Sequence, residues 1–113
     1  GGMCAATASA GTYDASFDVG GPLGLLAVGT KAHIALVRSG NVFTVYVNGN
    51  AAVIKTDSRT FYNSSKSFYV GKNDHASNQP YRGNIYAFRV TKGAARYTAN
   101  FTPPVAPFPT SGP

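Results

Sequence analysis

Glutamate is absent from this chain, and its four acidic residues are all aspartates: Asp14, Asp18, Asp57 and Asp74. Glutamate is the better helix former of the two acids, so long amphipathic helices are not expected. A glycoside hydrolase needs two carboxylic acids on either side of the scissile bond. The aspartates are scattered among turns and strand edges instead of alternating along one strand. The sequence therefore predicts no catalytic residues and no enzyme.

Cysteine, histidine and long apolar runs are scarce as well. The single cysteine, Cys4, cannot form an internal disulfide, and with His33 and His75 it gives no zinc-binding spacing. No Gly-x-Ser-x-Gly motif is present to supply a nucleophilic serine. No apolar run approaches the roughly 20 residues that a membrane-spanning helix needs. We predict no membrane insertion, and we interpret His33 as a packing or hydrogen-bonding residue at the start of a strand.

Positive charge exceeds negative charge. Ten Lys and Arg against four Asp give a net charge of +6, and the calculated pI is about 9.7. This balance suits an anionic partner such as nucleic acid, lipopolysaccharide or an acidic glycan. A strong phosphate-binding domain should show a basic stripe, whereas no three basic residues are consecutive here. We predict a solvated surface with a mild preference for polyanions and no nucleic-acid partner.

Residue types that favour strands and turns are abundant. Seven Tyr and seven Phe accompany many Val, Thr and Ile, all of which fit a pleated, half-buried surface. Thirteen Gly and seven Pro require frequent turns. The length of 113 residues suits one domain. We predict a single all-β domain over residues 1–113, in which residues 101–113, with five prolines, form an extended tail.

The clearest unit is a three-stranded antiparallel meander over residues 33–55. Gly40-Asn41 separates its first two apolar runs, and Asn48-Gly49 precedes the third. Asn-Gly is a strong hairpin signal because both residues tolerate the positive φ of a type I′ turn. In the second strand we expect one apolar face to meet the core: Phe43, Val45 and Val47. Both faces of the first strand are apolar, which predicts a central strand covered on both sides.

Two further strands are expected downstream. Phe68–Gly71 is a short apolar run, and Gly83–Thr91 is a longer one. In the longer run Ile85 and Phe88 are three residues apart, so a bulge near Tyr86-Ala87 would bring both to the core.

The polar loop between these strands is the predicted binding loop, because binding residues concentrate in such loops. Its amide, carboxylate and aromatic side chains suit sugar hydroxyls and a sugar face. The candidate carbohydrate-binding residues are Asn73, Asp74, His75, Asn78, Gln79, Tyr81 and Arg82. An ordinary solvated loop has the same composition, and Arg82 has an alternative role as a strand cap. Asp74 is also a weak calcium candidate, and no other cofactor is predicted.

Five segments together resemble a known family. They are His33–Asn41, Val45–Gly49, Phe68–Gly71, Arg82–Ile85 and Arg89–Pro104. Over residues 31–109 the chain resembles the concanavalin A-like lectin/glucanase (laminin-G) domains, most of all the versions in bacteriophage tail and other virion proteins. The resemblance implies an antiparallel jelly-roll β-sandwich. Family domains carry more strands ahead of the His33 strand than this chain has room for, so a partial sandwich is expected.

The resemblance also implies a biological setting. We expect a non-catalytic structural or adhesion module on the surface of a phage particle, in a tail fibre, tail tip or capsid decoration. Its partners would be host cell-surface glycans or other virion chains. If the chain begins at Gly1, neighbouring chains must cover its unpaired sheet edges, which predicts a homo-oligomer or a larger assembly. The alternatives are a carbohydrate-binding module of a secreted or surface bacterial protein, and an inactive scaffold without a ligand.

Overall fold

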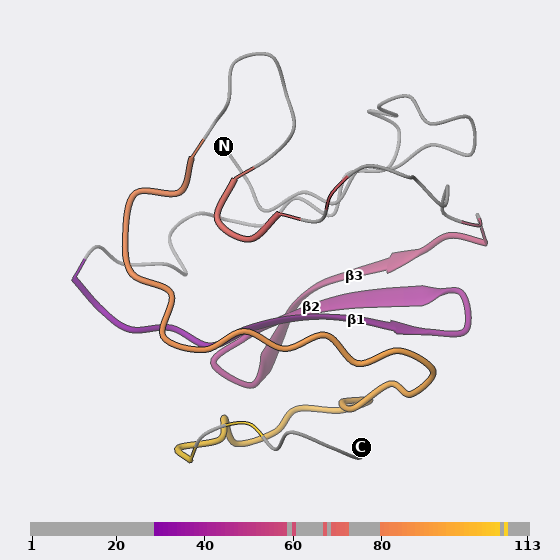
Figure 1. The fold of residues 1–113 in the computed structure, drawn as a ribbon. Helices are drawn as coiled ribbons and strands as arrows, with labels where there is room; N and C mark the ends of the chain where they lie inside the picture. The colour runs from indigo at the N-terminus through magenta and orange to yellow at the C-terminus, as the bar shows by residue number, and fades with distance from the viewer. Residues whose placement is uncertain are drawn as a thin grey trace.

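The computed structural model describes residues 29–58, 60, 67, 69–72, 80–106 and 108. This part of the chain contains no helix, and its strands are β1 (Ile34–Ser39), β2 (Val42–Val47) and β3 (Asn50–Thr56). They form an antiparallel sheet in the order β1-β2-β3 (Figure 1). The predicted meander is confirmed. Its central strand, however, is β2 and not the first strand.

The two turns of the meander use residues with positive φ. Gly40 (φ 61°) lies between β1 and β2, and Asn48 (φ 51°) and Gly49 (φ 84°) join β2 to β3. Positive φ at both central positions is what a type I′ turn requires, so the Asn-Gly prediction is confirmed. Asn48 also hydrogen-bonds the backbone of His33, the residue immediately before β1. Its amide N–H donates to the carbonyl of His33 at 2.8 Å, and its Oδ1 accepts from the His33 amide at 2.9 Å.

A β-bulge interrupts the pairing of β2 with β3. Val45 lies opposite Val53, whereas the next residue, Tyr46, lies opposite Ala51. Ala52 is therefore the extra residue on β3, and the ladder is locally disrupted there. The bulge lies beside the Asn48-Gly49 turn, where other parts of the chain dock.

The core is built on β2. Phe43, Val45 and Val47 are only 1%, 3% and 5% exposed, which confirms the expected core face. Burying each of these side chains contributes about 1.5–3 kcal/mol. Tyr46, on the opposite face, is 3% exposed, whereas Val42 on that face is 40% exposed, so the opposite face of β2 is covered at the end that holds Tyr46. The most deeply buried side chains of the described residues therefore all lie on the middle strand, β2.

The expectation for the first strand was wrong. Ile34 and Leu36 of β1 are 48% and 51% exposed, and β1 pairs only with β2 among the described residues. A strand at a sheet edge has a neighbour on one side only, so its side chains keep more contact with water. The apolar residues on both faces of β1 were therefore not sufficient evidence for a central strand.

The two downstream strands are not found in the described residues. Residues 83–91 form no strand and no bulged ladder, and Ile85, Phe88 and Val90 are between 49% and 67% exposed. Strand-forming side chains make a strand only where a second strand supplies ladder partners. In the shorter run, Gly71 has φ 82°, which extended backbone does not adopt. Phe68 lies outside the described residues.

The C-terminal part folds back along the sheet. Figure 1 shows residues 80–92 descending past the sheet and residues 93–106 turning back below it. We call residues 97–106 the strap. Its described residues form no strand, but Phe101 N donates to the carbonyl of Gly49 at 2.9 Å, and Asn100 Oδ1 accepts from Ala51 N at 3.0 Å. The strap thus docks on the type I′ turn and on the start of β3.

Aromatic rings complete this docking. Tyr97 and Phe101 stack with centroids 3.5 Å apart and planes 6° apart, and Tyr46 meets Phe101 edge to face at 5.3 Å. His33 makes edge contacts with Tyr97, Phe101 and also Phe108, at 5.6–6.3 Å. Such pairs contribute about 0.5–1.5 kcal/mol each beyond their buried area. His33 was expected to be a packing or hydrogen-bonding residue, and its ring packs on these aromatic side chains while its backbone makes the hydrogen bonds.

Candidate functional site

The structure describes two of the seven predicted carbohydrate-binding residues. Tyr81 and Arg82 are both exposed. The other five lie outside the described residues: Asn73, Asp74, His75, Asn78 and Gln79. Tyr81 N donates to the carbonyl of Gly71 at 2.6 Å. This hydrogen bond joins the two ends of the predicted binding loop and holds the backbone of Tyr81 beside Gly71.

The Tyr81 ring lies against the backbone of Gly83. A Cβ atom added at Gly83 would approach two ring carbons and the phenol oxygen of Tyr81 to 2.9 Å, closer than real Cβ contacts are. Glycine at this position therefore allows the ring to lie over the main chain. Tyr81 as a whole remains 61% exposed, and an exposed ring supported on one side by backbone is a suitable surface for an apolar partner.

Two other exposed tyrosines are each paired with a lysine. The Nζ atom of Lys31 lies over the ring of Tyr86, 4.7 Å from its centroid. Lys72 lies in the same way over Tyr69, at 4.5 Å. A cation over an exposed aromatic face contributes about 0.5–1 kcal/mol. Residues Tyr86 and Tyr69 are 68% and 39% exposed, so each pair holds an aromatic side chain and a positive charge together at the surface.

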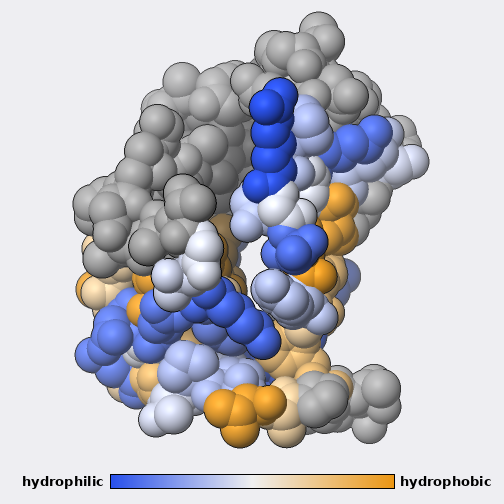
Figure 2. Space-filling model, turned by 90° about the vertical axis from the view of Figure 1, so that its left-hand side faces the viewer, coloured by the Kyte–Doolittle hydropathy of each residue, from blue (hydrophilic) through white to orange (hydrophobic). Residues whose placement is uncertain are grey.

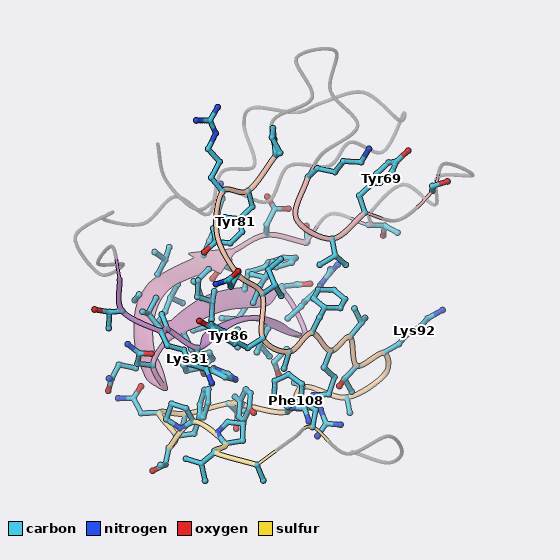
Figure 3. All side chains as sticks on the ribbon, turned by 60° about the vertical axis from the view of Figure 1, so that its left-hand side comes forward. Lys31, Tyr69, Tyr81, Tyr86, Lys92 and Phe108 are labelled. Atoms are coloured by element: carbon cyan, nitrogen blue, oxygen red, sulfur yellow. The ribbon has the colours of Figure 1, made fainter. Side chains whose placement is uncertain are left out.

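Figure 3 shows how these residues lie relative to one another. Tyr81 and Tyr86 project from the same side of the segment 80–92, one above the other, and Lys31 reaches Tyr86 from the chain ahead of β1. Tyr69 points away on the neighbouring loop. We call Lys31, Tyr81 and Tyr86 the tyrosine face. Figure 2 views the molecule from this side and shows a hollow bordered by hydrophilic and hydrophobic residues.

Sequence reasoning found Tyr81 but missed Lys31 and Tyr86. Tyr86 was assigned to a strand, where its ring would have been one member of a pleated surface. Lys31 precedes the first strand and carries no motif. Their pairing joins positions far apart in the sequence, and no local pattern signals it. The net charge of +6 was the only sequence feature that favoured a lysine beside the exposed rings.

Acidic groups are rare in the described part of the chain. Of the four aspartates only Asp57 is described, and it is half-buried at the end of β3, where its amide donates to the carbonyl of Asn41 at 2.7 Å. The described residues contain no group of three metal-ligating side chains. The calcium candidate Asp74 lies outside them, so its role stays a prediction.

No helix long and apolar enough to cross a membrane occurs in the residues that the structure describes.

An antiparallel all-β fold with exposed aromatic side chains on connecting segments is typical of binding modules built on β-sandwiches. The sequence pattern of the concanavalin A-like lectin/glucanases superfamily matches residues 3–96 of the chain, so the chain belongs to this family. The expected fold class is therefore confirmed as all-β, with the three-stranded sheet as part of a jelly-roll sandwich. No curated protein and no solved structure matches the chain.

The limits of the family match differ from those of the resemblance seen in the sequence. The match begins at residue 3 and ends at residue 96, whereas the resemblance was assigned to residues 31–109. The tyrosine face lies inside the matched region. The strap begins immediately after it, so the aromatic cluster at the Asn48-Gly49 turn joins a family domain to a segment beyond the match.

Proposed function

We propose that the chain is a non-catalytic carbohydrate-binding and adhesion module whose ligand binds at the tyrosine face. Family membership supports carbohydrate binding or adhesion in general terms. The observation that carries the specific proposal is the exposure of Tyr86, at 68%, with Lys31 holding its ring at the surface.

The chemistry of a sugar fits this arrangement. One face of a pyranose ring carries mostly C–H groups and packs on an aromatic ring, while its hydroxyls need hydrogen-bonding partners around the edge. Tyr81 and Tyr86 offer rings together with phenol hydroxyls that both donate and accept. Lys31 adds an ammonium group with three donors. A few placed polar groups around an apolar surface are the usual composition of a small-molecule site.

The absence of catalysis belongs to the same proposal. The superfamily includes glucanases, and their reaction needs an acid and a second carboxylate at fixed separation. The chain has no glutamate, and the tyrosine face consists of phenols and an ammonium. We propose that the module binds glycans and leaves them intact, with no cofactor, and that any calcium at Asp74 is dispensable for binding.

A glycan array followed by titration calorimetry tests the proposal. The full chain is expected to bind a subset of glycans saturably, equally with calcium and with a chelator. Tyr86→Ala and Tyr81→Ala should each weaken binding at least tenfold. Val105→Ala is the control, because Val105 is fully exposed and lies in the strap. Absence of binding to every glycan, or unchanged binding by both tyrosine variants, would contradict the proposal.

We further propose that the module works on the surface of a phage particle, in a tail fibre, tail tip or capsid decoration. The support is the sequence resemblance of five segments to virion versions of the family. The alternative setting is a secreted or surface bacterial protein that uses the same face. An antibody against the chain should label purified particles by electron microscopy. Labelling confined to cells or culture medium would favour the alternative.

Neighbouring chains are the second class of partner that we propose. Ile34 and Leu36 are about half exposed on β1, an edge strand within the described residues, and an edge presents unpaired backbone groups to another chain. We expect self-association of the purified chain in sedimentation velocity experiments. Leu36→Lys should shift it toward monomer. A wild-type chain that stays monomeric at every concentration tested would speak against self-assembly.

A further inference from the structure

The charges at the tyrosine face point to an acidic sugar. We infer that the glycan bound by Lys31, Tyr81 and Tyr86 carries a carboxylate or sulfate group beside the sugar ring that packs on Tyr86. This inference rests on the proposed function and narrows its ligand to one chemical class.

The surroundings of Lys31 favour an acidic ligand. Its Nζ lies 4.7 Å above the Tyr86 ring, and no carboxylate pairs with it among the described residues. The ring faces one side of the ammonium group, which has three N–H donors. Donors on its other side are therefore available for a ligand, and the exposed ammonium group attracts an anion.

Lys31, Tyr81 and Tyr86 together offer more hydrogen-bond donors than acceptor atoms. Neutral sugar hydroxyls donate as well as accept, so a site for neutral sugars gains from carboxylate or amide oxygens. The tyrosine face offers two phenols and an ammonium, and the single described carboxylate, that of Asp57, lies half-buried at the end of β3. Ligand oxygens that only accept, as in a carboxylate or sulfate, match this set of donors better than hydroxyls do.

The net charge of the whole chain also favours an acidic ligand. A net charge of +6 attracts acidic ligands and repels basic ones over distances of about a Debye length, ~8 Å at physiological salt. This field alone would not select a site. The tyrosine face adds the local element, because it places one of the lysines next to a ring on which a sugar can pack.

Phosphate-bearing polymers are the competing polyanions. Strong nucleic-acid binding needs several cations along a track, whereas the tyrosine face contributes one lysine. Single-stranded nucleic acid can also stack its bases on tyrosine, so an oligonucleotide is included in the test as a rival ligand.

The test compares matched pairs of oligosaccharides by titration calorimetry with the full-length chain. One pair differs only in a uronic acid in place of the neutral hexose, and a second differs only in sulfation, which separates the two sources of negative charge. We expect at least tenfold tighter binding of one acidic member over its neutral partner. The preference should shrink as salt is raised.

Lys31→Gln and Lys92→Gln form the matched variant pair. Both remove one positive charge from an exposed lysine, and Figure 3 shows Lys92 on the opposite side of the view from Lys31 and Tyr86. Lys31→Gln should abolish most of the acidic preference, Lys92→Gln should leave it within about twofold, and Lys31→Arg should restore it. Circular dichroism verifies that each variant is folded.

The outcomes separate the inference from the function on which it rests. Equal affinity for acidic and neutral partners would overturn the inference and leave glycan binding intact. Equal losses in Lys31→Gln and Lys92→Gln would also overturn it, because the effect would then be one of net charge. Tighter binding of an oligonucleotide than of any acidic glycan would do the same. No binding to any glycan would overturn both.

Discussion

His33 lies at the junction between the sheet and the strap and contacts both. Its backbone pairs with Asn48, and its ring meets Tyr97, Phe101 and Phe108. Its Nδ1 is buried without a hydrogen-bond partner among the described residues. Burial lowers the pKa of the imidazole below its usual 6.5, and the nearby charge of Arg89 lowers it further. The folded chain therefore favours neutral His33.

This pKa shift predicts loss of stability in acid. A group whose pKa is lower in the folded state binds its proton more readily in the unfolded state, so its contribution is present above pH 6.5 and is lost as the pH falls through the folded pKa. The thermal unfolding midpoint should fall between about pH 7 and about pH 5. In His33→Phe this pH dependence should be shallower. Identical pH profiles for the two proteins would refute the role of His33.

Gly49 combines two constraints that can be separated by mutation. Its φ is +84°, and an added Cβ would collide with the carbonyl oxygen of Phe101. Gly93 has a similar φ of +88° with nothing within 4 Å of an added Cβ. Gly93→Ala should lower the free energy of unfolding by about 1 kcal/mol through backbone strain alone.

Gly49→Ala should cost more than Gly93→Ala, because the strap must also move away from the turn. We expect a loss of about 2–4 kcal/mol in urea unfolding, the sum of backbone strain and lost docking contacts. Equal losses for the two variants would mean that the strap does not dock on Gly49.

At the scale of elements, Phe101 is one of two strap rings, with Tyr97, that hold the strap on the sheet. Phe101 stacks on Tyr97, meets Tyr46 and His33, and donates its amide to Gly49. Phe101→Ala should lower the free energy of unfolding by about 2 kcal/mol, below the 3–5 kcal/mol of a fully buried phenylalanine because the ring is half-buried. Val105→Ala, at a fully exposed position of the same strap, should leave stability unchanged.

Elements set by local signals were predictable from the sequence. The Asn48-Gly49 turn needs only two residues that tolerate positive φ, and alternation along residues 42–47 identifies the core face of β2. Which strand is central, and whether residues 83–91 form a strand, depends on which segments pair by backbone hydrogen bonds. This pairing is decided by contacts between residues distant in sequence. The tyrosine face was missed for the same reason, since Lys31 and Tyr86 meet only in the folded chain.

At the scale of the whole molecule, the strap and the tyrosine face differ in how far their aromatic rings are buried. The strap and its aromatic cluster close one face around Tyr46, while the tyrosine face leaves its rings open to water. The proposed function therefore assigns stability and binding to separate sets of aromatic residues. We expect Phe101→Ala to lower the free energy of unfolding without changing the glycan preference. Tyr86→Ala should weaken glycan binding without changing the free energy of unfolding. Calorimetry of both variants, by unfolding and by titration, measures this separation.

The most direct measurement is nuclear magnetic resonance of the labelled chain during titration with an oligosaccharide chosen from the array. The shifts of amide signals should concentrate at Lys31 and at residues 80–92, with little change at His33, Tyr46 and the strap. The sugar signals should remain those of the uncut oligosaccharide throughout. Shifts centred on the strap, or the appearance of cleaved sugar, would contradict the assignment of a non-catalytic binding site to the tyrosine face.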